Sequence, residues 1–174
     1  MAEILALDRN GERLIPIASG VCTSGEAQVC LRNQKASKLF VDAYAPEEAL
    51  GGLWLYFSCW NECHEIVQNL ESPEAYFWHA ILHRQEPDAG NASYWFRRVG
   101  SHAIFPGLCR AASDVVTSHP NVEFSPGDPW DPFCFIAFCE SARMQPGSPS
   151  ERAALEIQRA EWQLLFDYCA RPHA

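Results

Sequence analysis

Three residue pairs in which a helix-capping side chain precedes proline constrain the fold of this 174-residue chain more than any other feature. They are Ser72-Pro73, Asp131-Pro132 and Ser148-Pro149. A Ser or Asp side chain accepts hydrogen bonds from the free N–H groups of the first helical turn, and proline fits the first helical position because its φ is already near the helical value. The last pair begins a capping box, Ser148-Pro149-Ser150-Glu151, which predicts a long helix from there to about Ala170.

Hydrophobic periodicity predicts further helices between these starts. Apolar residues recur at helical spacing on two stripes from Pro46 to Leu70, which predicts one buried helix. Helices are also expected over 73–85, 94–99, 107–117 and 132–144. Asn91 or Ser93 would cap the helix over 94–99, after a loop over 86–93. The sequence therefore predicts an all-α fold, residues 1–174 forming a single domain of about six helices.

The first 45 residues are expected to form an irregular arm ahead of a helical core over 46–174. Residues 4–17 hold two short apolar runs around Asn10-Gly11, a pair typical of a tight hairpin turn. Pro16, Gly20 and Gly25 then interrupt any long element. A short β-hairpin is thus the one regular element that we expect in the arm.

Charge and hydropathy exclude two classes of partner. The formal net charge is -9, and no run of basic residues offsets it, so a phosphate backbone would be repelled. The longest apolar stretch, 50–60, is shorter than the roughly 18 residues that indicate a membrane span. We therefore expect neither nucleic acid nor membrane as a partner. The sequence leaves a small molecule or another protein as possible partners, and it does not determine the oligomeric state.

Eight cysteines raise the question of disulfides. The first twelve residues, MAEILALDRNGE, carry acids where a secretion signal needs basic residues and then an apolar run. We therefore expect a cytoplasmic protein with reduced thiols. No C-x-x-C pair occurs, and Cys59 and Cys63, four apart, are interpreted as buried inert thiols rather than as metal ligands.

Two histidines suggest a metal site. His79 and His83 lie four residues apart on the predicted helix 73–85, so that both rings project from one face, as they do when a helix offers two imidazoles to one ion. The alternative is that this face, which also carries Tyr76, is the solvated side of an amphipathic helix. Zinc and iron sites need a third ligand, and the candidates are His64, Glu65, Glu86 and Asp88.

His64 is the most notable of these candidates. It lies on the apolar stripe of the predicted helix 46–70, where a polar ring needs a partner. A hydrogen bond to backbone or to a carboxylate would satisfy it without any metal. The connection over 70–73 is short, however, and short connections join antiparallel neighbours, which would bring His64 towards His79 or His83.

The segment after the histidines, RQEPDAGNASYWFRRVG over 84–100, mixes charge with aromatic residues. One interpretation is that its arginines, including Arg98, pair with its carboxylates and hold a turn rigid. The other is that an arginine lines a pocket for an anionic or planar ligand together with aromatic residues. The candidate ligand-binding residues are Arg84, Glu86, Asp88, Asn91, Tyr94, Trp95 and Arg97.

The run WHAILHRQEPDAGNASYWFRRVGSH, residues 78–102, carries the pattern H-x-x-x-H-R-x-E-P-D-x-x-N-x-x-Y-W-F-x-x-V-G. It resembles a segment of a group of uncharacterised bacterial and fungal proteins, in which an H-E-I segment like that of residues 64–66 precedes it. The resemblance covers about a quarter of the chain and implies no activity. It implies that one pattern contains His64, His79, His83, Arg84, Glu86, Asp88, Asn91, Tyr94 and Trp95.

Three functions follow as hypotheses. The first, which we favour, is a small metal-dependent or acid–base enzyme. Its catalytic residues would be His64, His79, His83 and Glu65, and the three histidines would bind zinc, iron or manganese. The second is a non-catalytic protein that binds a small anionic or planar ligand. The third is a structural or protein-interaction module.

Overall fold

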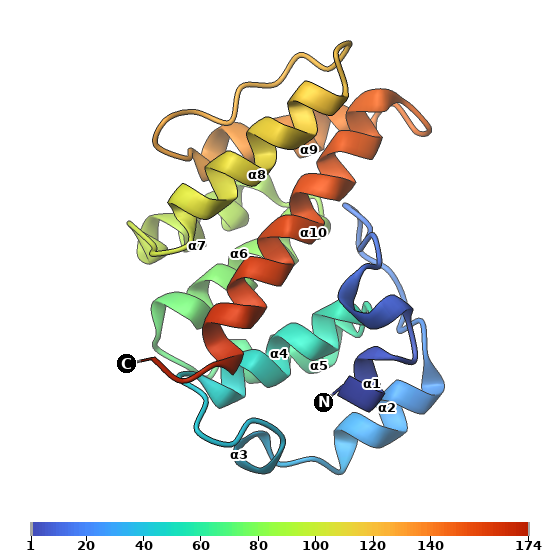
Figure 1. Cartoon of the computed structure of the whole chain (residues 1–174), viewed down its shortest axis with the longest axis vertical. Coiled ribbons are helices and arrows are strands. Elements are labelled where there is room, and N and C mark those ends of the chain that lie inside the picture. The colour runs from blue at the N-terminus through green and yellow to red at the C-terminus, as the bar shows by residue number, and fades with distance from the viewer. Residues whose placement is uncertain (1, 174) are drawn as a thin grey trace.

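The computed structural model describes residues 2–173, which form ten α-helices and one 3-10 helix, with no β-strand among them (Figure 1). The all-α prediction is confirmed, whereas the count of six helices and the hairpin are wrong. A 3-10 helix over Arg9–Gly11 stands where the hairpin turn was expected. The α-helices are α1 (Ala2–Leu5), α2 (Gly25–Arg32), α3 (Ala36–Leu39), α4 (Pro46–Tyr56), α5 (Trp60–Val67), α6 (Pro73–Gln85), α7 (Ala89–Val99), α8 (Phe105–Ser118), α9 (Pro132–Arg143) and α10 (Pro149–Ala170).

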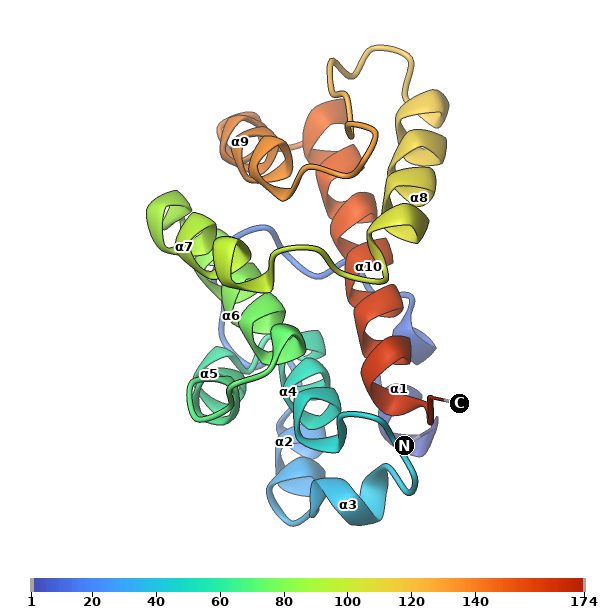
Figure 2. The same ribbon diagram turned by 90° about the vertical axis from the view of Figure 1, so that its left-hand side faces the viewer.

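Helix α10 runs through the middle of the molecule (Figure 1). Helices α8 and α9 pack beside its N-terminal half, and α4 packs beside its C-terminal half. Helices α6 and α7 form a pair on one side, with α5 next to α6 (Figure 2). This pair and α5 position the candidate site.

The three predicted helix starts are confirmed. The side chain of Ser72 accepts a hydrogen bond from the backbone N–H of Ala75 at 3.1 Å, and Ser148 caps α10 in the same way. Asp131 accepts from the N–H of Phe133 at 2.8 Å. Helix α6 has the predicted bounds, and Ser72, its cap, follows α5 after a short connection.

The prediction of one helix from Pro46 to Leu70 is wrong, because the chain breaks between α4 and α5. Ser58 takes a left-handed φ of 58°, which no helix continues through. The carbonyl of Phe57 accepts hydrogen bonds from the backbone N–H of Thr23 at 2.8 Å and from its hydroxyl at 3.0 Å. The arm therefore occupies a carbonyl that a continuous helix would use itself.

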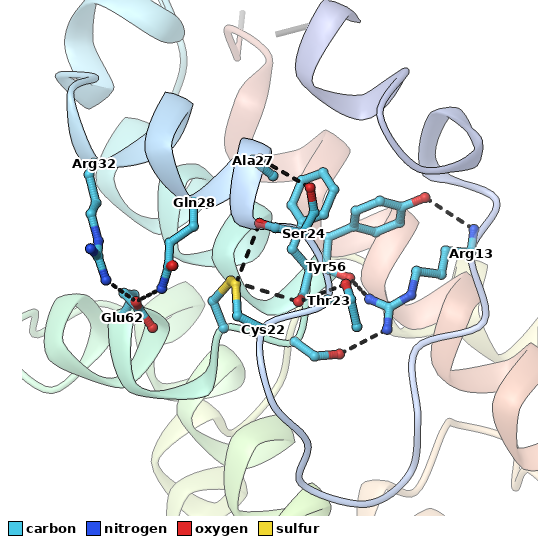
Figure 3. Close-up of a disulfide and its surroundings, with 12 residues drawn as sticks. Arg13, Cys22, Thr23, Ser24, Ala27, Gln28, Arg32, Tyr56 and Glu62 are labelled. Atoms are coloured by element: carbon cyan, nitrogen blue, oxygen red, sulfur yellow. Dashed lines mark hydrogen bonds and ion pairs between the residues drawn. A yellow bond between two sulfur atoms is a disulfide. The ribbon is translucent and has the colours of Figure 1, made fainter.

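The arm is irregular over 12–24, but it also carries short helices that we did not expect, and it is covalently tied to the core. A disulfide joins Cys22 to Cys59, with 4.2 Å between the Cα atoms, so the expectation of reduced thiols is wrong for this pair (Figure 3). The Thr23 hydrogen bonds explain the proximity, since they hold the next residue of the arm against the end of α4. Cys63 is buried as expected, and burial raises the pKa of its thiol.

One apolar core joins the arm to the helices. It extends from Ile4 to Cys169 and includes Ile15, Leu31 and Phe40 of the arm. Over residues 2–173, no helix combines the length and the apolar character needed to cross a bilayer.

A buried ion pair crosses this core. The guanidinium of Arg84 on α6 binds the carboxylate of Glu161 on α10, and both side chains are fully buried. Although burial disfavours its charge, the neighbouring Glu161 raises the pKa of Arg84. Arg84 also donates to Gln158, which donates in turn to the carbonyl of Ile15 at 2.8 Å. The network thus links α6, α10 and the arm.

Helix α7 begins earlier than predicted, which matters for the site. Asp88 is its cap, accepting from the N–H of Asn91 at 3.0 Å, so caps at Asn91 or Ser93 are wrong. The predicted loop over 86–93 shrinks to residues 86–88. The predicted end at Gly100 is confirmed, where φ is 65°. The longer α7 covers the face of α6 that carries the histidines.

Candidate metal centre

Three histidines from two neighbouring helices meet in one place. His64 lies on α5, and His79 and His83 lie one turn apart on α6. One ring nitrogen of each lies within 4.8 Å of the other two. The predicted approach of His64 to the other two is therefore confirmed.

Stacked rings support the cluster from two sides. The rings of His79 and His83 stack at 4.9 Å, and the ring of His64 stands almost perpendicular to both, at 88° and 87°. Trp60 stacks on His64 at 4.8 Å, and Trp95 of α7 stacks on His79 at 4.0 Å. The tryptophans restrict the tilt of these rings and keep the nitrogen atoms directed at one another.

The cluster is not on a solvated face. His79 and His83 are only 4% and 7% exposed, because Trp95 and Asn91 of α7 lie over them, while His64 is partly exposed. The alternative of a wet helix face is thus wrong for these two rings. An ion would approach from the side of His64.

The distance between two of the nitrogens suits a shared ion. Nε2 of His64 lies 3.1 Å from Nε2 of His79. Two nitrogens bound to one ion at about 2.0–2.1 Å, with an angle of about 90–109° between the bonds, lie about 2.8–3.4 Å apart. Without an ion, one of these nitrogens must carry a hydrogen and donate it to the other. Nδ1 of His79 is buried and has no hydrogen-bond partner among the described residues.

The surroundings of His79 and His64 favour the neutral form of these two rings. Burial lowers the pKa of His79 to about 3, and the neighbouring His83 and His64 add to this effect. Burial also lowers the pKa of His64, again with a contribution from His83. Neutral imidazole is the form that binds metals, because each ring then keeps one lone pair.

His83 has two polar partners of its own. Its Nδ1 lies 2.9 Å from a carboxylate oxygen of Glu86, three residues along the chain. The side-chain amide nitrogen of Asn91 lies 3.3 Å from Nε2 of the same ring. Glu86 and Asn91, both among the candidate site residues, thus surround His83 rather than a separate ligand.

Two of the candidate acids do not reach the cluster. Glu65 is exposed and lies outside the group of close ring nitrogens, although it follows His64 directly. His64 points into the cluster, whereas Glu65 points away from it, because successive residues of a helix do not share a face. Asp88 caps α7. Neither supplies a third ligand in this structure.

The predicted pairing of arginines with local carboxylates is wrong. Arg84 points to α10, Arg97 lies over the ring of Phe133, and Arg98 lies over the ring of Tyr76. The structure does not bring Arg84 and Arg97 into one pocket with the half-exposed Tyr94. Trp60 was missed as a site residue, although it lies four positions before His64, a spacing that places two helical side chains together.

A pocket of about 550 Å³ lies beside the cluster. Trp60 and Glu86, the neighbours of His64 and His83, are part of its wall, and so is the Cys22–Cys59 disulfide. The pocket therefore reaches the outer partners of the histidines, and Gln28, Arg32 and Glu62 of its wall supply polar groups.

Comparisons of the chain with protein-family models, with curated proteins and with solved structures give no match. The resemblance of residues 78–102 to a group of bacterial and fungal proteins stays a prediction.

Proposed function

We propose that this protein binds one divalent transition-metal ion between His64, His79 and His83, and that a small metal-dependent enzyme is built on this ion. The observation that carries the proposal is the meeting of three imidazole nitrogens within 4.8 Å, two of them 3.1 Å apart. Two consecutive helices, α5 and α6, supply these rings. Tryptophan side chains stack on two of them.

A purely structural role accounts less well for the cluster. A buried polar atom without a partner costs roughly 1–3 kcal/mol, and within residues 2–173 Nδ1 of His79 is such an atom. Apolar side chains of similar size would pack between α5, α6 and α7 without this cost. An ion between the rings would bind at Nε2 of His79, which faces His64, and would leave Nδ1 as it is. The metal–nitrogen bonds would then stabilise the cluster and offset the cost of burying these polar rings.

The ligand type narrows the choice of metal. Imidazole suits zinc, iron, copper and nickel, whereas manganese prefers carboxylate and water oxygens. Because the close group consists of three histidines and no carboxylate, zinc is our first choice and iron(II) the second. Three protein ligands leave a coordination position for water or substrate, as in catalytic zinc sites.

The low pKa of His79 suits a metal ligand better than a general acid or base. A general acid or base works best when its pKa lies near the working pH, and burial lowers the pKa of His79 to about 3. At neutral pH His79 is therefore a poor proton donor but a good ligand.

The experiment is a zinc titration of protein freed of metal by a chelator, followed by calorimetry and by elemental analysis. We expect one equivalent to bind. Replacing His79 by Gln should weaken binding more than the roughly 10–100-fold that loss of an outer partner costs. His119, which pairs with Glu156 outside the cluster, provides the control, and His119→Gln should bind zinc like the wild type.

Circular dichroism establishes that each variant is folded before the comparison. No stoichiometric binding of zinc or of iron(II) by the wild type would overturn the proposal. So would equal affinity of the wild type and a folded variant that lacks both His64 and His79.

A further inference from the structure

We infer that Glu86 is a positioning residue, which holds His83 in the tautomer whose hydrogen is on Nδ1 and so keeps the Nε2 lone pair available. The consequence for metal affinity rests on the proposed function, whereas the tautomer itself does not.

The contact between the two side chains fixes where the hydrogen lies. Nδ1 of His83 and Oε2 of Glu86 are 2.9 Å apart. An ionised carboxylate has no hydrogen and can only accept, so a hydrogen bond at this distance requires that Nδ1 donates. In a neutral imidazole only one nitrogen carries hydrogen, and Nε2 is then left with its lone pair.

Asn91 lies close to the same ring but does not select between its tautomers. Its amide nitrogen lies 3.4 Å from Nδ1 and 3.3 Å from Nε2 of His83. The lone-pair directions of the two ring nitrogens diverge, so an amide at nearly equal distance from both lies along neither. The contact with Glu86 therefore determines the tautomer, and the lone pair of Nε2 stays available.

The backbone at the end of α6 holds Glu86 close to His83. Glu86 directly follows α6 as its C-terminal cap, three positions after His83, and its backbone N–H still bonds to the carbonyl of Leu82. Arg143 adds support nearby, because its guanidinium donates to the carbonyl of Arg84 at 2.7 Å. The side chain of Glu86 is 46% exposed and is part of the pocket wall. It therefore acts through His83 and does not belong to the close group of ligand atoms.

The chemical consequence concerns the third ligand. A histidine binds a metal through a nitrogen that carries no hydrogen, and a carboxylate on the opposite nitrogen both fixes the tautomer and makes the ring more basic. Without Glu86 the hydrogen of His83 can move to Nε2, and the ring then offers no lone pair there. The carboxylate thus selects the form of His83 that can coordinate.

The first test needs no metal. Long-range proton–nitrogen NMR spectra of the metal-free protein at pH 8, above the usual histidine pKa, report the tautomer of His83. We expect the Nδ1–H form in the wild type and in Glu86→Gln, whose amide oxygen still accepts. Glu86→Ala should show a mixture or the Nε2–H form. An Nε2–H ring in the wild type, or an unchanged ring in folded Glu86→Ala, would overturn the inference.

The second test measures zinc affinity by competition with a coloured chelator. Glu86→Ala should bind zinc about 10–100-fold more weakly than the wild type, and Glu65→Ala, an exposed acid next to His64, should stay within about twofold. Equal zinc affinity of Glu86→Ala and the wild type would overturn this role for Glu86 while leaving the metal site intact. If the wild type binds no zinc but shows the expected tautomer, the proposed function fails and the assignment of His83 stands.

Discussion

Removal of the carboxylate of Glu161 should destabilise this protein more than the loss of any exposed ion pair. The side chains of Glu161 and Arg84 are 0% exposed, so Glu161→Leu leaves a guanidinium inside the core with no countercharge. Gln158 still accepts from it at 3.2 Å, but this amide is neutral. Breaking a buried pair by deleting one partner costs roughly 3–5 kcal/mol in free energy of unfolding. For a chain of this size that corresponds to a fall in Tm of roughly 6–20 °C.

Urea unfolding followed by circular dichroism measures this difference, with linear extrapolation to water. Asp167→Asn is the control, because it breaks the pair between Asp167 and Arg171, whose side chains are 55% and 70% exposed. Such a pair contributes about 0–1 kcal/mol. The double variant Arg84→Met/Glu161→Leu should recover most of the loss, since no isolated charge remains. A loss for Glu161→Leu no larger than that of the control would refute the reasoning.

Three further predictions test other parts of the structure. Cys22→Ser removes the disulfide, whose cysteines are 37 residues apart, and loop-closure entropy predicts a loss of about 4 kcal/mol in the free energy of unfolding measured in urea. The reduced wild type should show the same loss. Equal stability of the oxidised and the reduced wild type would contradict this prediction. Gly52→Ala puts a Cβ 2.7 Å from the buried ring of Trp78 and should lower the free energy of unfolding by about 1–3 kcal/mol, despite the better helix propensity of Ala. The control Gly25→Ala has open space around it and should not lower the stability. A stabilised Gly52→Ala would show that the ring of Trp78 moves freely. In metal-free protein, the unfolded state takes up a proton on His79 as the pH falls below about 6.5, whereas in the folded state the pKa of His79 is about 3. The free energy of unfolding should therefore fall between pH 6.5 and 5, by up to about 1.4 kcal/mol per pH unit more in the wild type than in His79→Gln. Parallel pH profiles of the two proteins would argue against a buried neutral ring.

Local signals predicted the parts of the fold that depend on neighbouring residues. Ser72, Asp131 and Ser148 act as helix caps as expected, because a cap and the N–H groups that it binds lie within three residues of one another. The cap of α7 was predicted at Asn91 or Ser93 instead of Asp88. All three residue types favour that position, and the sequence offers no means to rank them.

Features formed by distant residues could not be predicted in the same way. The break at Ser58 arises because the arm binds the carbonyl of Phe57, and periodicity within 46–70 carries no record of that contact. Arg84 was expected to pair with nearby acids, but its partner Glu161 lies 77 positions away. The same holds for Cys22 and Cys59, which only the fold brings together.

The candidate site was predicted in part, because some of its contacts depend on neighbouring residues and others on distant ones. The spacing of His79 and His83 and the short connection before α6 were sufficient to predict that His64 approaches them. The burial of the rings was not predicted, because it depends on α7, whose early start places Trp95 over His79. The contact of Glu86 with His83 follows from a spacing of three on one helix, which the sequence does contain.

Anomalous diffraction at the zinc absorption edge, from crystals grown with zinc, tests the central claim most directly. We predict one strong peak between the rings of His64, His79 and His83, at about 2.0–2.1 Å from a nitrogen of each ring. Zinc found only at other residues, or an empty cluster in crystals that contain zinc elsewhere, would contradict the account.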